Sequence, residues 1–365
     1  MTRNPRARAA RGRSRVGERF EVEVGPVAHG GHCVARVTDE GRVVFVRHAL
    51  PGERVVVEIT EGTEGDRFWR GDAVEVLSGS ADRVVAPCRF AGPGRCGGCD
   101  FQHVTLDRQR GLKADVVREQ LSRLARLDVD VVVEPVPGDE DGLHWRTRQR
   151  YVPLPGGGLG MRKHRSHDVV EIDECLIEGP PPSYAVRGRE FAVAEDGFWQ
   201  VHPGAPEVLV DTVLDQLAPR PGESALDLYA GVGLFARFLL DAVGAGGRVV
   251  AVEADRRAAT SAVANCPDAE VRTGPVERVL ATAYDEPFDL VVLDPPRTGA
   301  KRKVVTQVAA RRPRAVAYVA CDPAALARDV AIFAEHGYRL DALRAFDLFP
   351  MTHHVECVAL LSLDR

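Results

Sequence analysis

One cysteine stands where a nucleophile would be exposed at the end of a strand. This residue, Cys321, follows the apolar run Ala315–Ala320, and a second apolar run, Leu290–Leu293, ends in Asp294-Pro295-Pro296-Arg297. Because the carboxyl ends of parallel strands meet at one edge of a sheet, we expect Cys321 and Asp294 to face the same crevice. A lone cysteine is more often a buried small hydrophobe, so the interpretation as a covalent catalyst depends on this context.

A glutamate near the end of the chain is the candidate general base. Glu356 lies directly ahead of the apolar run Cys357–Leu361, and a carboxylate inside such a run is costly unless it has a task. His353 and His354 are further candidates, which we rank below Glu356 because of its strand context. If a thiolate adds to C6 of a uracil, C5 becomes nucleophilic and can take up a methyl group. A base must afterwards remove the C5 proton so that the thiolate can leave.

A glycine turn after a third apolar run suggests a nucleotide site. Ser224–Leu228 leads into Tyr229-Ala230-Gly231-Val232-Gly233, and glycines there let the backbone approach a ligand closely. The third glycine of the dinucleotide fingerprint is absent. Asp227 before the turn and Glu253 at the end of the next strand, placed to accept hydrogen bonds from ribose hydroxyls, favour S-adenosylmethionine (AdoMet) over a dinucleotide.

The elements that would position these residues fall into two classes. From residue 203 onward, strand-like and helical runs alternate, which predicts a doubly wound α/β domain of the Rossmann-like class over residues 203–365. Between residues 17 and 79, five short strands separated by turns predict a small β-barrel of the oligonucleotide-binding kind. Residues 80–202 form a central α+β domain that carries a cysteine cluster and basic strands.

The charge is unevenly distributed along the 365 residues. Net charge is −5, but residues 1–19 contain seven arginines, and residues 143–167 contain six basic and no acidic side chains. We expect residues 1–16 to be a disordered tail and the second stretch to bind a phosphate backbone. No apolar run approaches the roughly 18 residues of a membrane span, and no apolar segment follows the arginines as in a secretory signal. The sequence therefore predicts a cytoplasmic protein, and we expect a monomer.

These motifs together resemble one family. The chain is similar to the bacterial RNA (uracil-5-)-methyltransferases, in the 23S rRNA-type branch with an N-terminal TRAM domain and an iron–sulfur cluster. The resemblance rests on Asp294-Pro-Pro-Arg and on Cys-x-Pro-x-x-x-x-Arg-Asp from Cys321 to Asp329. It implies that Cys321 is the nucleophile and Glu356 the base, and that AdoMet is bound. The cofactor contacts would be Gln200 of a Phe-x-Gln motif, Asp227, Tyr229, Gly231, Gly233, Glu253 and Asp294.

Three positions depart from the family pattern. The family usually has asparagine where this chain has His202, Leu234 and Asp322. The first two changes remove amide side chains that could hold cofactor or base, so they put affinity and substrate preference in question, but they spare the nucleophile and the base. Phe198 and Trp199 beside the Gln200 motif offer either stacking surfaces for RNA bases or core packing.

Four of the eight cysteines form a candidate metal site. Cys88, Cys96, Cys99 and Cys175 give C-x7-C-x2-C and a distant fourth thiol, which suits zinc or an iron–sulfur cluster. The second C-x2-C clip of a zinc ribbon is absent. The family resemblance implies a [4Fe-4S] cluster, although the first spacer is two residues longer than usual.

Other functions stay open at this point. A paired uracil is inaccessible to a thiolate, so the target would be a single-stranded or flipped base. The TRAM domain and cluster favour ribosomal RNA, with tRNA as the alternative, by analogy alone. Cytosine-5 methylation is less favoured because Asp-Pro-Pro-Arg stands where a second cysteine would be expected. An RNA-binding protein with an inactive methyltransferase domain would bind AdoMet without transferring methyl groups.

Overall fold

The computed structural model describes residues 12–37 and 41–363. Its contacts divide the chain into two compact units. The first unit, which we call the barrel unit, comprises Met1–Leu112, Arg150–Leu176 and Met351–His353; the second, the sheet unit, comprises Lys113–Gln149, Ile177–Pro350 and His354–Arg365. The chain passes between the units more than once, so they do not coincide with the predicted domain boundaries, which stay a prediction.

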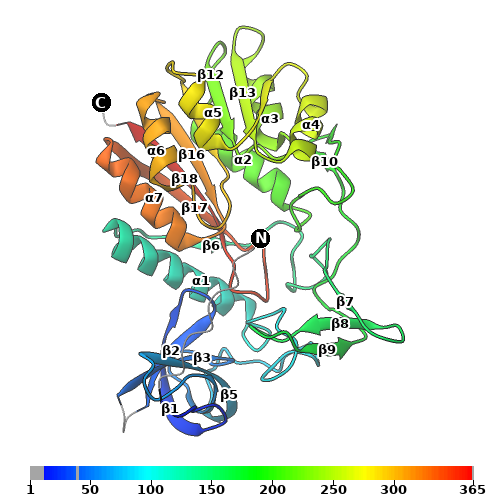
Figure 1. Cartoon of the computed structure of the whole chain (residues 1–365), viewed down its shortest axis with the longest axis vertical. Helices are drawn as coiled ribbons and strands as arrows, with labels where there is room; N and C mark the ends of the chain where they lie inside the picture. Colours follow the sequence, from blue (N-terminus) through cyan, green and yellow to red (C-terminus); the bar gives the residue numbers. More distant parts are fainter. Residues whose placement is uncertain (1–11, 38–40, 364–365) are drawn as a thin grey trace. The chain divides into compact units, whose positions relative to one another are not determined.

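The barrel unit contains the predicted five-stranded barrel (Figure 1). The strands close in the order β1-β2-β3-β5-β4. Alternate side chains fill the interior, and Val44, Val46 and Trp69 are fully buried there. The bounds are β1 Arg19–Ala28, β2 His32–Val37, β3 Arg42–Arg47, β4 Arg54–Glu61 and β5 Phe68–Ser78.

The residues just ahead of the barrel correct the prediction of a disordered tail. Residues 1–11 lie outside the described residues, but Ser14 forms a β-bridge with Thr63. The Arg15 side chain is buried, with its guanidinium 4.9 Å from the centre of a Trp69 ring. This cation–π contact holds residues 12–16 against the barrel, which the arginine-rich composition could not indicate.

The rest of the barrel unit is mainly irregular. Strands β7 (Val152–Pro153), β8 (Leu159–Arg162) and β9 (Val169–Ile172) form a small antiparallel sheet around the predicted glycine-rich turn. An isolated bridge joins Cys96 to Lys163, so the cysteine segment lies against this sheet.

The sheet unit is a Rossmann-like α/β domain, as the sequence predicts. Its eight strands run in the order β14-β13-β12-β15-β16-β18-β17-β6, with β14 to β16 parallel and β18 antiparallel to β16. The strand bounds are β6 Val133–Glu134, β12 Ser224–Leu228, β13 Arg248–Glu253, β14 Glu270–Thr273, β15 Leu290–Leu293, β16 Ala315–Ala320, β17 Tyr338–Phe346 and β18 Glu356–Leu363. A separate antiparallel pair in the same unit is formed by β10 Ala185–Val186 and β11 Arg189–Glu190.

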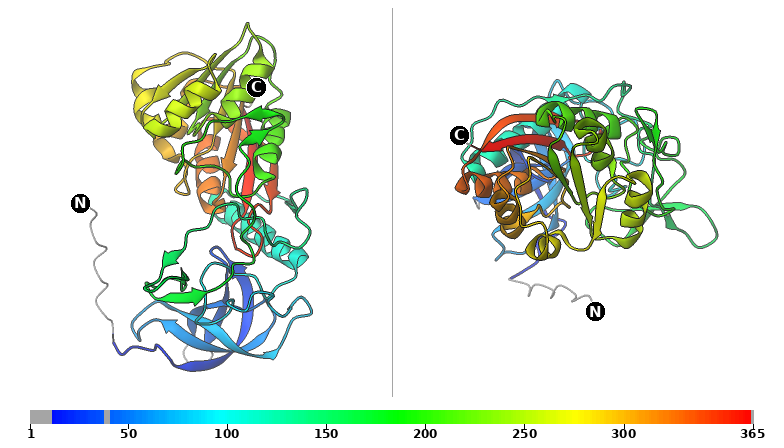
Figure 2. Two further views of the ribbon diagram at one scale, coloured as in Figure 1. Left: turned by 90° about the vertical axis from the view of Figure 1, so that its right-hand side faces the viewer. Right: turned by 90° about the horizontal axis from the view of Figure 1, so that it is seen from above.

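Helices cover both faces of this sheet (Figures 1 and 2). The apolar side chains form two clusters, one that includes α5, α6 and α7 and another that includes α2 and α3. Strands β15 and β16 are buried along their whole length, as a sheet covered on both faces requires. The bounds are α2 Ala205–Leu217, α3 Leu234–Val243, α4 Arg256–Asn265, α5 Val276–Thr282, α6 Lys301–Ala310 and α7 Pro323–Glu335.

The predicted helix over residues 106–127 is interrupted near its end. Helix α1 spans Leu106–Gln120, and a π-helical turn, η1, follows over Leu121–Ala125. Arg126 closes the turn in the left-handed conformation, with φ of 57°. Within the described part of the chain, no helix is long and apolar enough to cross a membrane.

Candidate active site

The strand register brings Cys321 and Glu356 together. Strand β16 pairs antiparallel with β18, and the last pair joins Ala320 to Cys357. Continuing this register by one position sets Cys321 opposite Glu356. Side chains of directly opposed residues lie on the same side of a sheet, with Cβ atoms about 5 Å apart. The sequence predicted both residues, but only the pairing of β16 with β18 places them side by side.

Charges around Cys321 oppose its ionisation. Burial raises the pKa of the thiol to about 12, and the carboxyls of Glu356 and Asp294 add to the rise. Burial and Asp294 also raise the pKa of Glu356 well above its ordinary value, and Glu356 is only 4% exposed. The guanidinium of Arg297 acts in the opposite direction on both groups. These mutual effects show that the thiol and both acids converge on one site.

A buried aspartate fixes the loop that carries Asp294. Asp329 on α7 accepts hydrogen bonds from the backbone N–H of Ala300 at 2.7 Å and from the hydroxyl of Tyr318 at 2.6 Å. It also accepts one from the backbone N–H of Lys301. This carboxylate therefore ties α7, which starts just after Cys321, to the end of the Asp-Pro-Pro-Arg loop. In the sequence, Asp329 is recognisable only as part of a motif, and nothing there indicates this role.

Replacing Asp329 by Ala is expected to destabilise the sheet unit by about 3 kcal/mol, because several buried donors would lose their acceptor. Tyr318→Phe removes a single donor of the same network and should cost about 1 kcal/mol. Urea unfolding of both variants measures the difference. Equal stability of Asp329→Ala and the wild type would show that the loop does not depend on this carboxylate.

The glycine turn after β12 has the shape of a nucleotide site. Gly231 and Gly233 adopt φ angles of 56° and 87°, and a Cβ atom at Gly231 would meet no atom within 4 Å. Glu253 accepts hydrogen bonds from the N–H groups of Gly231 at 2.8 Å and Asp255 at 2.6 Å. Each carboxylate oxygen keeps a second lone pair for a ribose hydroxyl.

Two further acids complete this site. Asp227 is fully buried on β12 and accepts a hydrogen bond from the N–H of Ala236, while its other oxygen, Oδ1, has no partner in the described structure. Burial raises the pKa of Asp227 and of Asp294 to about 7 each, and Glu253 adds to both rises. An open glycine turn surrounded by crowded carboxyls fits AdoMet, since its sulfonium cation would relieve their repulsion.

Tyr229 follows Asp227 in the left-handed conformation, with φ of 64°, and is half-buried. Gln200 lies in the irregular segment before α2 and is also half-buried. No contact joins Gln200 to the glycine turn within the described residues, so its role in cofactor binding stays a prediction. Trp199 is core, 4% exposed and packed against the ring of Phe191, whereas Phe198 is 68% exposed.

The three departures from the family pattern differ in consequence. Asp322 caps α7 by accepting a hydrogen bond from the N–H of Ala325, a task that asparagine performs equally well. Leu234 is the first residue of α3 and is buried in the core. His202 is buried, accepts a hydrogen bond from the N–H of Gly204 and stacks on Trp145 with ring centres 5.8 Å apart.

The two other base candidates are held by other residues. The imidazole of His354 lies 3.0 Å from the guanidinium of Arg297, in the sheet unit. His353 belongs to the barrel unit, where its Nδ1 lies 2.6 Å from a carboxylate oxygen of Asp100. The guanidinium of Arg297 thus occupies one ring nitrogen of His354, and His353 is held within the barrel unit.

The four cysteines of the candidate metal site gather in the barrel unit. Burial raises the pKa of Cys99 to about 12, and the neighbouring thiols of Cys175 and Cys96 raise it further. Burial also raises the pKa of Cys96, and the nearby thiols of Cys175 and Cys88 raise it further. Even so, no group of three or more His, Cys, Asp or Glu side chains among residues 12–37 and 41–363 could hold a metal ion. The iron–sulfur cluster is therefore not shown.

The basic residues between 143 and 167 are divided between the two units. Arg146 and Arg148 belong to the sheet unit, and the other four belong to the barrel unit. Arg148 donates a hydrogen bond to the carbonyl oxygen of Glu195, and Arg165 pairs with Glu61 at 3.4 Å. Part of this charge thus holds the protein's own structure together, and its contact with RNA stays a prediction.

Comparisons with known proteins match both parts of the chain. Residues 13–74 match the TRAM domain, residues 205–315 the methyltransferase small domain, and residues 278–364 the tRNA (uracil-5-)-methyltransferase family. A protein of Streptomyces avermitilis, named as an RNA methyltransferase, is 45% identical over 95% of this chain and 98% of its own length. The chain belongs to the RNA (uracil-5-)-methyltransferase family.

A further relative supports this membership, and a solved structure supports the fold. An RNA methyltransferase of Bifidobacterium longum is 39% identical over 94% of this chain and 96% of its own length. The tRNA (uracil-54, C5)-methyltransferase of Pyrococcus abyssi, solved with S-adenosyl-L-homocysteine, has the same fold, with a TM-score of 0.67 and 21% identity over 94% of this chain and 99% of that one. The predicted RNA (uracil-5-)-methyltransferase family, the TRAM barrel and the methyltransferase fold are therefore confirmed, whereas the 23S rRNA-type branch stays a prediction.

Proposed function

We propose that this methyltransferase forms 5-methyluridine in RNA through a covalent bond between Cys321 and C6 of the target uracil. The observation that carries the proposal is the register of β16 and β18, which sets the thiol opposite the Glu356 carboxyl. A nucleophile and a base side by side are what a reaction at the adjacent carbons C6 and C5 requires.

In the proposed reaction, the Cys321 thiol gives its proton to water and its sulfur forms a bond to C6. The electrons of the C5–C6 double bond then make C5 nucleophilic, so that it can accept a methyl group. AdoMet supplies that group as an electrophilic methyl when it is bound. The guanidinium of Arg297, which favours the thiolate, supports the first step.

Glu356 then removes the proton from C5, the double bond re-forms, and the sulfur–C6 bond breaks to release Cys321. A carboxylate with a raised pKa is a stronger base, and burial beside Asp294 gives Glu356 that property. Gly231, Gly233 and Glu253 would hold the nucleoside end of AdoMet, with Asp227, Tyr229, Asp294 and Gln200 around it.

We further propose 23S ribosomal RNA as the substrate. The support is the resemblance to the branch with a TRAM domain, which this chain has at residues 13–74. Transfer RNA is the second candidate, because the family model at residues 278–364 and the Pyrococcus abyssi enzyme are both named for tRNA. The cytoplasmic location and the monomeric state also stay predictions.

Transfer of labelled methyl groups to unmodified large-subunit rRNA and to bulk tRNA tests the function. We expect label in rRNA uracil with the wild type and none above background with Cys321→Ala. Cys33→Ala, which removes a buried thiol of the barrel, is the matched control and should stay active. Label on tRNA alone would overturn the substrate choice, and no label on either RNA would favour the alternative of an inactive RNA-binding protein.

We also propose that Cys88, Cys96, Cys99 and Cys175 hold a [4Fe-4S] cluster. The proposal is supported by four half-buried thiols that lie in one unit and affect one another's pKa. In addition, the N–H of Gly98 donates a hydrogen bond to the sulfur of Cys96. Hydrogen bonds of this kind tune such clusters. The cluster would stabilise the barrel unit rather than take part in methyl transfer, which involves no electron transfer.

Metal analysis of anaerobically purified protein tests the cluster. We expect about four iron atoms per chain in the wild type and in Cys33→Ala, and a loss of most iron in Cys96→Ser. Zinc in place of iron would overturn the cluster but keep the metal site. Protein without metal that is folded and active would overturn both.

A further inference from the structure

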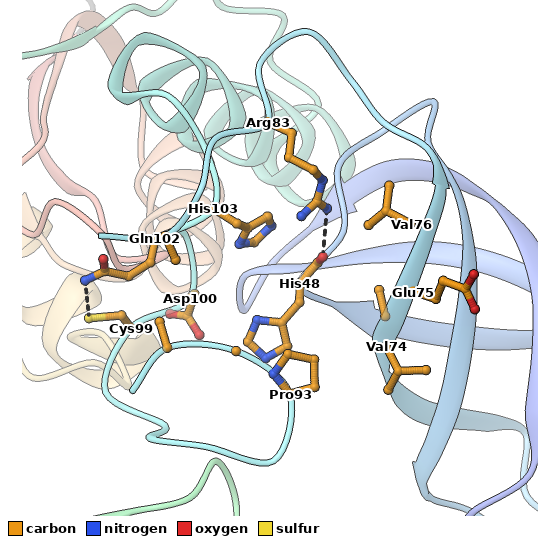
Figure 3. Close-up of a pocket in the computed structure, with 14 residues that line it drawn as sticks. His48, Val74, Glu75, Val76, Arg83, Pro93, Cys99, Asp100, Gln102 and His103 are labelled. Carbon is orange, nitrogen blue, oxygen red and sulfur yellow. Dashed lines mark hydrogen bonds between the residues drawn. The ribbon is translucent and has the colours of Figure 1, made fainter. Parts of the chain in front are cut away.

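A pocket of the barrel unit lies apart from all the residues of the proposed reaction. Its volume is about 160 Å³, and it opens between the end of β5 and the segment 83–103 (Figure 3). The side chains that matter below are His48, Val74, Val76, Arg83, Pro93 and His103. Neither Cys321 nor the glycine turn contributes to it.

Two buried imidazoles give the pocket unused hydrogen-bonding groups. His48 and His103 are each 9% exposed, and the Nε2 atom of each has no hydrogen-bond partner in the described structure. An oxygen of Asp72 lies 4.0 Å from His48 Nε2, which is beyond hydrogen-bond distance. Unsatisfied buried polar atoms are unfavourable, so a ligand that pairs with them gains affinity.

The charge state of the pocket is neutral. Burial lowers the pKa of His48 to about 3 and that of His103 to about 4, so both rings are uncharged at neutral pH. The ring of His103 is hydrogen-bonded to the backbone of Ala49. Since Nε2 has no partner, Nδ1 makes this bond, and Nε2 of the neutral ring is an acceptor.

The one cationic side chain in the lining is already occupied. Arg83 pairs with the fully buried Glu53 through two contacts of 2.6 Å, and it donates a third hydrogen bond to the carbonyl oxygen of His48 at 2.9 Å. The carboxylate of Glu75 points away from the pocket (Figure 3). Phosphate would find no unpaired cation among these lining residues, so an uncharged ligand fits better.

The walls suit a flat ring. Val74 and Val76 of β5, which are 36% and 37% exposed, line the pocket together with Pro93. A cavity of about 150 Å³ accommodates benzene, so this volume suits one six-membered ring rather than a fused pair. Apolar walls with hydrogen-bonding groups at one end are how proteins hold unpaired bases of RNA.

We propose that this pocket binds an unpaired pyrimidine base of RNA, with the apolar walls against the ring and the two imidazoles at its polar edge. The base is distinct from the uracil that is methylated, because the pocket contains none of the reacting residues. This inference rests on the proposed action on RNA. The barrel unit, whose residues 13–74 match the TRAM domain, would then bind single-stranded RNA through one of its bases.

Binding of two fluorescent oligonucleotides of about 12 nucleotides, one oligocytidylate and one with the same backbone but no bases, tests the pocket. We expect the wild type to bind oligocytidylate at least about five-fold more tightly than the abasic strand. His103→Phe and, separately, Val76→Trp should reduce this ratio to about one and leave the abasic affinity unchanged. Glu23→Gln, at an exposed position of β1 that does not line the pocket, is the control and should keep the wild-type ratio.

A ratio of one in the wild type, or a wild-type ratio in either folded pocket variant, would overturn the proposal. An equal loss of oligoadenylate binding in both variants would overturn the choice of a pyrimidine. Val76→Trp changes an exposed position, so the test does not depend on the fold tolerating a change at buried His103. The assay contains neither AdoMet nor uracil, so a failure of methyl transfer would not affect its outcome.

Discussion

Replacing Glu356 by Gln is expected to trap the protein on its RNA. Without a base to remove the C5 proton, the methylated uracil would stay bonded to Cys321, and turnover should fall by about 10²-fold or more. Glutamine has nearly the shape of the protonated acid and carries no charge, so the buried position should tolerate it. A denaturing gel with labelled methyl groups would show protein and RNA migrating together.

Two further variants decide what such a band means. Cys321→Ala combined with Glu356→Gln should abolish the adduct, because no sulfur is available to bond with C6. Glu335→Gln, an exposed glutamate of α7, is the matched control and should turn over as the wild type does. Full turnover by Glu356→Gln would exclude Glu356 as the base. Loss of turnover without an adduct would place Glu356 before methyl transfer.

The sequence predicted the centre of the sheet unit accurately because its strands are short and mainly apolar runs. Ser224–Leu228, Leu290–Leu293 and Ala315–Ala320 coincide with β12, β15 and β16. Strand β17 was not predicted, since its sequence Tyr338–Phe346 mixes charged and apolar residues and several of its side chains are half exposed. Yet β17 and β18 form the antiparallel edge that brings Glu356 to Cys321.

The sequence alone could not predict polar interactions between residues that lie far apart along the chain. Asp329 was noticed only as the last residue of a motif, because its hydrogen-bond partners Ala300 and Tyr318 are distant along the chain. The division of the basic stretch between two units depends on how the chain folds back, which composition does not encode. Arg15 shows the same limitation, because its burial requires Trp69, more than fifty residues away along the chain.

Lys113 is the strongest example, and it carries the largest predicted effect on stability. This lysine lies on α1 in a charged stretch, yet its side chain is fully buried and donates hydrogen bonds to Asp347 and to the carbonyl oxygen of Phe349. Lys113→Met should lower the free energy of unfolding by about 3–5 kcal/mol, because the Asp347 carboxylate would stay buried without its cation. Urea unfolding, followed by the fluorescence of the buried Trp145 and Trp199, measures this loss.

A second substitution separates charge from packing. Lys113→Met combined with Asp347→Asn removes both charges and should recover most of the lost stability, since a buried ion pair contributes little relative to neutral groups of similar size. Lys303→Met, at an exposed position of α6, should change stability by no more than about 0.5 kcal/mol. If the double variant is as unstable as Lys113→Met alone, the lysine stabilises the sheet unit through the packing of its side chain and its bond to Phe349, and the unpaired carboxylate is not the cause.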